Sequence, residues 1–283
     1  MKQQLIGLAL GTSIGCTIEE GFPLLKKHGI ESTFTMVNTP DVLTTYADLA
    51  AQYGIGFSSL HAPFKHAAKM WDDTAEGNDA EQELHDSIDA CEIVNAPILV
   101  VHPFIGFYDH TPTQTGLDRY RRLAEHAAQK NVRLALENVE GEAELKYLMD
   151  GLRDFDSVGF CLDTGHELCY NRGRDMLAEY GDRLCYLHIN SNMGVTSPDG
   201  KIGWRDDSHM LPFDGIADME FLADRLAGLK YDGVLMMELV KGNRPDRNTN
   251  DIYNELTPDE YVGAAAKRIK RLRDMIEEKE TVR

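Results

Sequence analysis

The chain has few cysteines, few basic residues and no long apolar segment, and each shortage excludes a class of protein. Its five cysteines are scattered and form no Cys-x-x-Cys pair, which argues against a disulfide framework and a zinc knuckle and indicates reduced thiols. No apolar run comes close to the roughly 20 residues that a membrane span needs. We therefore expect a cytoplasmic protein with no membrane partner.

Basic residues are outnumbered, with 29 Lys and Arg against 47 Asp and Glu, so the formal net charge is −18. Proteins bind nucleic acids largely by neutralising phosphates with Lys and Arg. The charge therefore argues against a nucleic-acid partner. The one basic cluster, residues 267–273, lies in a helical pattern that ends in an acidic stretch, and we interpret it as a solvated helix face.

Strand-like and helix-like segments alternate along the whole chain of 283 residues. Short apolar runs without polar alternation are typical of parallel strands buried on both faces. Strands are predicted at Leu5–Leu10, Ser32–Met36, Ile55–Leu60, Ile98–His102, Val132–Glu137, Val158–Asp163, Leu184–Ile189 and Val234–Leu239. Helices are predicted at Thr17–Lys27, Asp41–Tyr53, Asp79–Val94, Gly116–Lys130, Arg174–Tyr180, Met219–Leu229 and about Pro258–Glu280. This alternation predicts an α/β fold, a single (β/α)8 TIM barrel, as one domain over residues 1–283.

Six of these strands lead directly into residues that bind metals or transfer protons. They are His61, His102, Glu137, Asp163 with His166 just behind it, His188 and Glu238. Barrel enzymes build their active sites at the carboxyl ends of their strands. The recurrence of imidazoles and carboxylates at these ends predicts a metal-dependent enzyme.

Four of these residues end the fifth to the eighth predicted strands, and we expect them to converge on one rim: Glu137, Asp163, His188 and Glu238. Three carboxylates and one imidazole suit Mn²⁺, Mg²⁺, Co²⁺ or Zn²⁺, with coordination positions left for water or substrate. Without a cation, carboxylates gathered in this way would repel one another, and some would have to be protonated.

Further residues could hold additional metal ions or bind the substrate. His61 and His102 could reach a second metal that shares Glu137, an environment suited to zinc, or could hydrogen-bond to substrate or backbone. Asp207 and His209 lie two residues apart in a loop. With His166 they could hold another ion, grip substrate hydroxyls, or bond to neighbouring backbone.

Two predicted connections are too long for simple turns, 104–114 after His102 and 191–215 after His188. Long loops on the active face of a barrel often determine substrate specificity. We expect substrate contacts from Phe104, Trp204 and Arg205, which lie in these loops.

The chain contains the motifs LHAP, HP, LEN, LDTGH, LHxN, DxHxxPxxG and a strand-ending ELV, in this order. Taken together, these motifs resemble the xylose isomerase-like barrel superfamily, and the resemblance extends from Leu5 to about Leu272. The superfamily includes sugar phosphate isomerases and epimerases, ketose 3-epimerases, and the endonuclease IV type of abasic-site nuclease (AP endonuclease family 2). Each motif is weak alone, whereas their order and spacing are specific.

The resemblance implies two different activities. In ketose epimerases, the residues matching Glu137, Asp163, His188 and Glu238 hold one divalent metal, and the two glutamates move the proton. In the nuclease branch, nine residues hold three metals, and all nine have a match here: His61, His102, Glu137, Asp163, His166, His188, Asp207, His209 and Glu238. The nuclease branch would be expected to have basic and aromatic loops that bend DNA, and this chain shows no such cationic loop.

We therefore expect a metal-dependent isomerase or epimerase acting on a sugar, sugar phosphate or polyol, through a metal-stabilised enediolate. The alternative is an endonuclease IV-type multi-zinc phosphodiesterase acting at abasic DNA sites. A lyase or dehydratase acting on a polyol would use the same metal and the same proton abstraction. A non-catalytic sugar-binding barrel is a further alternative. The expected partner is a small carbohydrate, and barrels of this kind often form homo-oligomers.

Overall fold

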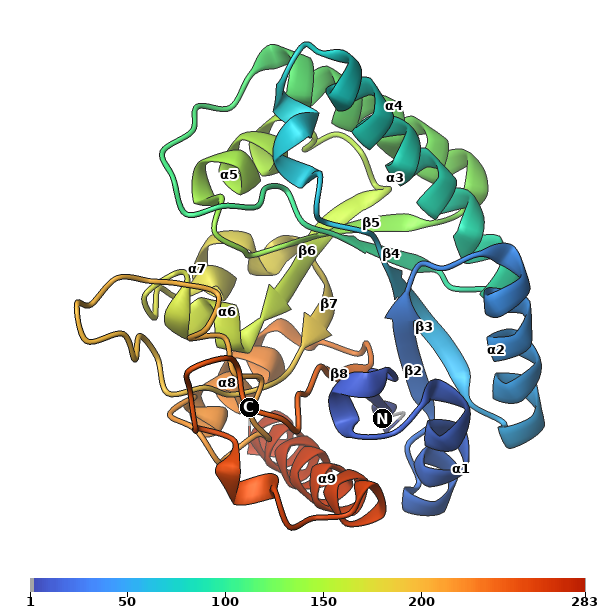
Figure 1. Ribbon diagram of the computed structural model, residues 1–283, viewed down its shortest axis with the longest axis vertical. Coiled ribbons are helices and arrows are strands. Elements are labelled where there is room, and N and C mark those ends of the chain that lie inside the picture. The colour runs from blue at the N-terminus through green and yellow to red at the C-terminus, as the bar shows by residue number, and fades with distance from the viewer. Residues whose placement is uncertain (1–2, 283) are drawn as a thin grey trace. The chain divides into compact units, whose positions relative to one another are not determined.

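The structure is a computed structural model that describes residues 3–282, so the first two residues and the last residue of the predicted domain lie outside the described residues. Strands and helices alternate along the chain (Figure 1). The strands are β1 (Ile6–Leu8), β2 (Ser32–Met36), β3 (Gly56–His61), β4 (Ile98–Val101), β5 (Arg133–Glu137), β6 (Val158–Asp163), β7 (Leu184–His188) and β8 (Leu235–Met237). All eight predicted strands are confirmed.

The predicted helices are also confirmed, and two further α-helices, α5 and α6, occur between them. The α-helices are α1 (Ile18–His28), α2 (Pro40–Tyr53), α3 (Ala75–Val94), α4 (Gln114–Lys130), α5 (Glu142–Gly151), α6 (Thr164–Cys169), α7 (Met176–Tyr180), α8 (Met219–Leu229) and α9 (Pro258–Val282). Short 3-10 helices are η1 (Thr12–Ile14), η2 (Ala67–Trp71), η3 (Gly181–Arg183) and η4 (Asp251–Tyr253).

Helix ends follow the capping chemistry of the sequence. Thr17 and Glu20 form a reciprocal capping box at the start of α1, and Gly29 ends that helix in the left-handed conformation. The start of α3 was predicted wrongly at Asp79. The helix begins at Ala75 because the Thr74 side chain accepts a hydrogen bond from the backbone N–H of Gly77, which caps the first turn.

The residues group into two compact units. The first unit comprises the residues up to Thr33, Leu49–Gly56, and the residues from Leu162 onward; the second comprises Phe34–Asp48 and Phe57–Cys161. The prediction of a single domain over the whole chain stays a prediction.

In the first unit, β1 lies parallel to β8, with Ile6 opposite Leu235 and Leu8 opposite Met237. Ile189, which follows β7, pairs with Met237, so β7 is the next neighbour of β8. Every residue of β1 and β8 is buried, as expected for strands covered on both faces. The last helix, α9, packs against α8 and α1 (Figure 1).

In the second unit, β4 lies between β3 and β5, and β5 pairs with β6, all in parallel. Leu99 is opposite Leu60 on one side and Leu134 on the other. Glu137 is paired with Cys161 at the carboxyl end of β5. Because parallel strands in register end at the same edge of a sheet, the side chains that follow β3, β4 and β5 emerge together.

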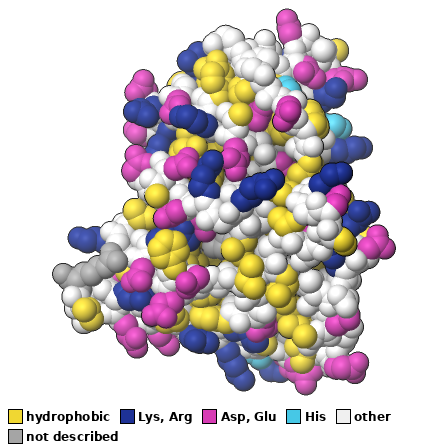
Figure 2. Space-filling view, turned by 90° about the vertical axis from the view of Figure 1, so that its left-hand side faces the viewer, with side chains coloured by type: hydrophobic (Ala, Val, Ile, Leu, Met, Phe, Trp, Pro, Cys, Tyr) yellow, Lys and Arg dark blue, Asp and Glu magenta, His cyan; other side chains and the backbone are white. Residues whose placement is uncertain are grey.

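One face of the surface carries charges of both signs (Figure 2). On the face shown in Figure 2, Lys and Arg side chains are interspersed with Asp and Glu side chains, and apolar side chains lie scattered among them. Across residues 3–282, no helix is long and apolar enough to cross a membrane.

Candidate metal centre

Asp163 is held in place at the junction of β6 and α6. It is the last residue of β6 and caps α6, because its Oδ1 accepts a hydrogen bond from the backbone N–H of His166 at 2.7 Å. Its Oδ2 accepts a hydrogen bond from Nδ2 of Asn190 at 2.8 Å. A Cβ atom at Gly165 would overlap with Oδ1 of Asn190, so a glycine is required at this position. The carboxylate is therefore fixed on both oxygens.

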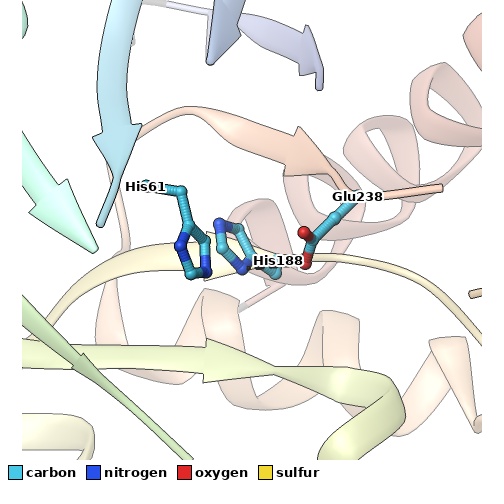
Figure 3. Close-up of side chains that lie close together, drawn as sticks. All are labelled: His61, His188 and Glu238. Carbon is cyan, nitrogen blue, oxygen red and sulfur yellow. Dashed lines mark ion pairs between the residues drawn. The ribbon is translucent and has the colours of Figure 1, made fainter. Parts of the chain in front are cut away.

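His188 and Glu238 complete a donor group with Asp163 in the first unit. His188 ends β7, Glu238 follows β8, and Nδ1 of His188 lies 3.1 Å from Oε2 of Glu238 (Figure 3). Ligand atoms of Asp163, His188 and Glu238 all lie within 4.8 Å of one another. Asp163 and His188 are fully buried, whereas the Glu238 side chain is 25% exposed. Glu238 is thus the donor of this group that solvent or a substrate can reach.

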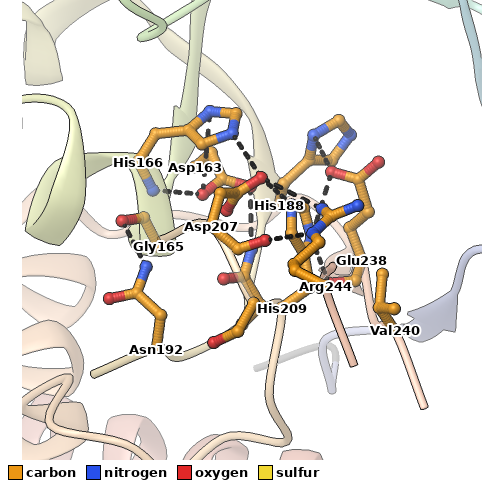
Figure 4. A network of polar contacts seen from close by, with 12 residues as sticks. Asp163, Gly165, His166, His188, Asn192, Asp207, His209, Glu238, Val240 and Arg244 are labelled. Carbon is orange, nitrogen blue, oxygen red and sulfur yellow. Dashed lines mark hydrogen bonds and ion pairs between the residues drawn. The ribbon is translucent and has the colours of Figure 1, made fainter. Parts of the chain in front are cut away.

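Asp207, His166 and His209 form a second cluster in the same unit, which we call the Asp207 corner (Figure 4). Oδ2 of Asp207 lies 2.6 Å from Nε2 of His209 and 3.4 Å from Nε2 of His166. Nδ1 of His209 donates to the backbone carbonyl of Glu238 at 2.9 Å, which directs Nε2 toward Asp207. Ligand atoms of Asp163, His166 and His209 also lie within 4.8 Å of one another.

The electrostatics of this corner hold Asp207 and His209 in their charged forms in the absence of a cation. Burial acts to raise the pKa of Asp207, but the imidazoles of His209 and His166 outweigh it and hold that pKa well below its usual range. Burial acts to lower the pKa of His209, but the Asp207 carboxylate outweighs it and raises the pKa to about 9. The two side chains form a buried ion pair.

The donors of the first unit fit a divalent cation. The Asp207 side chain is only 7% exposed, and its Oδ1 is buried and has no hydrogen-bond partner among the described residues. A buried carboxylate oxygen is costly unless it is hydrogen-bonded or coordinates a cation. Carboxylate and imidazole donors at these separations suit Mn²⁺, Zn²⁺ and similar ions. The buried clusters are therefore consistent with a metal site.

Another group of candidate ligands lies in the second unit. Oε2 of Glu137 is 3.0 Å from Nε2 of His102 and 3.4 Å from Nε2 of His61. His61 ends β3, and its Nδ1 donates to the carbonyl of Ala62 at 2.8 Å, which turns Nε2 toward the carboxylate. Ligand atoms of His61, His102 and Glu137 lie within 4.8 Å of one another, so this group could also hold a metal ion.

The three predicted substrate contacts have different environments. Phe104 is buried and stacks on His110, with 5.0 Å between the ring centroids. Trp204 is 47% exposed, and the Arg205 guanidinium lies over its ring, 5.3 Å from the centroid. Their contact with a substrate stays a prediction.

Three polar residues around the candidate metal ligands of the first unit were not predicted from the sequence. Asn190 holds Asp163, as described above. Arg244 donates from Nε to the backbone carbonyl of Asp207 at 2.6 Å, and its Nη2 lies 3.3 Å from Oδ2 of Asp207 (Figure 4). Nδ2 of the buried Asn250 donates to the carbonyls of Ser208, Val240 and Gly242 at 2.9, 2.7 and 3.2 Å. Asn190 is the N of the LHxN motif, whereas no motif indicated Arg244 or Asn250.

Comparison with known proteins decides the family. Residues 22–274 match the family described as Xylose isomerase-like TIM barrel. The chain belongs to this family.

Solved structures of similar fold include two sugar epimerases. D-allulose 3-epimerase from Methylomonas sp. in complex with D-allulose has a TM-score of 0.71 at 17% identity, over 95% of this chain and 97% of that chain. D-psicose 3-epimerase from Clostridium cellulolyticum with D-tagatose has a TM-score of 0.70 at 16% identity, over 96% of this chain and 99% of that chain. These similarities, with the family, confirm the predicted TIM barrel.

Curated relatives match over shorter stretches. An uncharacterized protein of Sinorhizobium fredii is 31% identical over 119 residues, 40% of this chain and 35% of that protein. A probable endonuclease 4 of Mycoplasma capricolum is 30% identical over 159 residues, 49% of this chain and 54% of that protein. The chain thus spans between about a third and about half of the length of these relatives.

Proposed function

We propose that this protein is a metal-dependent isomerase or epimerase of a sugar or polyol. The observation that carries the proposal is the donor group of Asp163, His188 and Glu238, in which two donors are fully buried and one carboxylate is accessible. This arrangement allows a cation to be held from inside the protein while Glu238 faces an incoming substrate. The fold similarity to two epimerases that bind D-allulose and D-tagatose is consistent with this substrate class.

Asp163, His188 and Glu238 would hold the metal, with Glu137 as the fourth ligand implied by the family resemblance. When bound, a divalent cation would polarise a carbonyl oxygen and the hydroxyl on the adjacent carbon, which acidifies the proton on that hydroxyl-bearing carbon. The Glu238 carboxylate is assigned the removal of that proton, and the protonated carboxyl group of Glu137, which ends β5, is assigned the delivery of a different proton. Delivery to the opposite face of the same carbon gives an epimer, and delivery to the neighbouring carbon gives an isomer.

His166 is assigned to a substrate oxygen. Its backbone N–H is bound to Asp163 and its ring stacks on Tyr170, with 4.6 Å between the centroids, so the imidazole has a defined orientation. A fixed imidazole can orient a hydroxyl group without contributing a proton to the reaction. Dehydration of a polyol would begin with the same proton abstraction and is distinguished by its product.

Solvent exchange tests the proposal directly. The purified protein is loaded with Mn²⁺ or Co²⁺ and incubated in D₂O with a panel of ketoses and polyols that includes D-allulose and D-tagatose. Proton abstraction predicts deuterium at a single carbon of one substrate and formation of its epimer or isomer, both observed by NMR. The same protein treated with chelator is the control. Absence of exchange across ketoses and polyols would contradict the proposal.

A second candidate is phosphodiester cleavage at abasic DNA sites, favoured by the Asp207, His166 and His209 corner and by the partial match to a probable endonuclease 4. The charge of the neighbouring loops counts against it. Arg205, Arg244 and Arg247 each lie within 3.9 Å of an Asp carboxylate oxygen, so they are partly neutralised before any phosphate arrives. Three zinc ions per chain by elemental analysis, with cleavage of an abasic oligonucleotide, would establish this activity instead.

A further inference from the structure

The loops that follow β7 and β8 are joined by three ion pairs in a row. Consecutive residues of the first loop pair with residues of the second: Arg205 with Asp246 at 3.9 Å, Asp206 with Arg247 at 3.6 Å, and Asp207 with Arg244 at 3.3 Å. In the first loop Arg205 is basic, whereas Asp206 and Asp207 are acidic, and each residue faces a partner of opposite charge. We call these three pairs the loop ladder.

The three pairs differ in burial. The side chains of Arg205 and Asp246 are 46% and 82% exposed, and an exposed pair of this kind contributes little to stability. Asp207 is only 7% exposed, and Arg244 is 26% exposed. Arg244 is therefore the ladder arginine that interacts with a carboxylate of the candidate metal centre in a largely dry environment.

Arg244 holds Asp207 at two points. Nε donates to the backbone carbonyl, which fixes the main chain, and Nη2 lies 3.3 Å from Oδ2, which restrains the carboxylate (Figure 4). The planar guanidinium carries both donors at a fixed separation. A lysine ammonium is a single point charge on a flexible stem, so it cannot reproduce the two contacts together.

The consequence concerns the other oxygen of Asp207. Oδ2 is shared among Arg244, His209 and His166, whereas Oδ1 is buried and has no hydrogen-bond partner among residues 3–282. We propose that Arg244 is a positioning residue, which fixes the Asp207 carboxylate so that Oδ1 is presented to a divalent cation. This inference rests on the metal centre of the proposed function but does not depend on which sugar is turned over.

The expected effect is on cation affinity. Groups that orient a metal ligand typically contribute about 10- to 100-fold to affinity. R244A should therefore lower the affinity of the Asp207 corner for a cation by about this factor. R244K should lower the affinity nearly as much, because the two-point contact is lost in both variants.

Cobalt titration measures this affinity without any substrate. The full-length protein is stripped with chelator and titrated with Co²⁺, and binding is followed by visible absorption. D207N identifies the spectral component that belongs to the Asp207 corner. R205A is the matched control, because it removes an arginine of the same ladder from an exposed pair, and it should bind like the unmodified protein.

The outcomes are distinct. Weaker binding of that component in R244A and R244K, with R205A unchanged, supports the positioning role. Unchanged affinity in R244K, or tighter binding in R244A because the guanidinium competes with the cation, overturns it. If R244A does not fold, as judged by circular dichroism, R244K gives the answer. Failure of the sugar chemistry would instead appear as absent turnover in the unmodified, fully metal-loaded protein.

Discussion

Nδ1 of His209 donates a hydrogen bond to the backbone carbonyl of Glu238 at 2.9 Å. The loop after β7 is thereby tied to the residue that follows β8, and one imidazole links two groups of the candidate centre. The backbone of His209 is in the left-handed region, with φ at +46°, where residues other than Gly and Asn are uncommon. The Val240 N–H donates to the His209 carbonyl at 3.0 Å and helps to maintain this conformation.

The ion pair between His209 and Asp207 predicts a pH dependence of stability in the metal-free protein. The pKa of His209 is about 9 in the folded state, above its ordinary value of 6.5. A raised pKa contributes stability that is fully present below about pH 6.5 and is lost as the pH rises through about 9. The free energy of unfolding should therefore fall between pH 6.5 and 9.5 more steeply in the unmodified protein than in H209Q. Urea titrations with chelator present measure both, and parallel profiles would refute the ion pair.

Substitution of the two glutamates should separate proton transfer from metal binding. E238Q and E137Q keep the size of the side chain but cannot accept a proton, so each should lower kcat by about 10²- to 10⁴-fold once the substrate is known. E83Q, which alters an exposed glutamate beside His66, is the control and should be unaffected. Measured with metal in excess, substantial activity in either E238Q or E137Q would remove that residue from the proposed proton path.

Replacement of Gly165 should disturb the centre without removing any ligand. A Cβ atom there overlaps with Asn190, so G165A must displace the amide that donates to Asp163. We expect a loss of about 1–3 kcal/mol in the free energy of unfolding and weaker metal binding. G203A is the control, because a Cβ at Gly203 meets nothing within 4 Å. Thermal unfolding and metal titration of both variants check this, and equal behaviour of the two would contradict it.

The cysteines should differ in reactivity. Burial raises the pKa of the Cys91 thiol to about 12, and burial also raises that of Cys169. Only the thiolate reacts quickly, so buried thiols are protected twice. Cys16 and Cys185 are partly exposed. We expect about two thiols to react with a disulfide reagent in the native protein at pH 8 and five after denaturation. A rapid reaction of all five thiols in the native protein would show that the regions around the buried cysteines open readily.

The sequence predicted those parts of the molecule that depend on local pattern. The strand-ending residues were located because a buried apolar run stops at a polar side chain, as at Asp163 and His188, and this signal is contained in a few neighbouring residues. The predicted start of α3 was wrong because Thr74 supplies the cap and the helix continues through Gly77 and Asn78, two weak helix formers that lie just before Asp79. Arg244 and Asn250 could not be found in this way. Asp207 lies 37 residues from Arg244 and Ser208 lies 42 residues from Asn250, and only the folded loops bring these pairs together.

Asn250 links the loops that follow β7 and β8 through contacts that do not depend on pH or on salt concentration. The exposed pair of the loop ladder, Arg205 with Asp246, weakens as the salt concentration rises, because salt screens exposed charges more than buried ones. The buried amide of Asn250 carries no charge, cannot titrate, and bonds to three carbonyls. High ionic strength should therefore release Arg205 from Asp246 while the two loops stay docked. Salt is thus a reversible counterpart of R205A, which breaks the exposed pair and leaves the buried contacts of Arg244 and Asn250 in place.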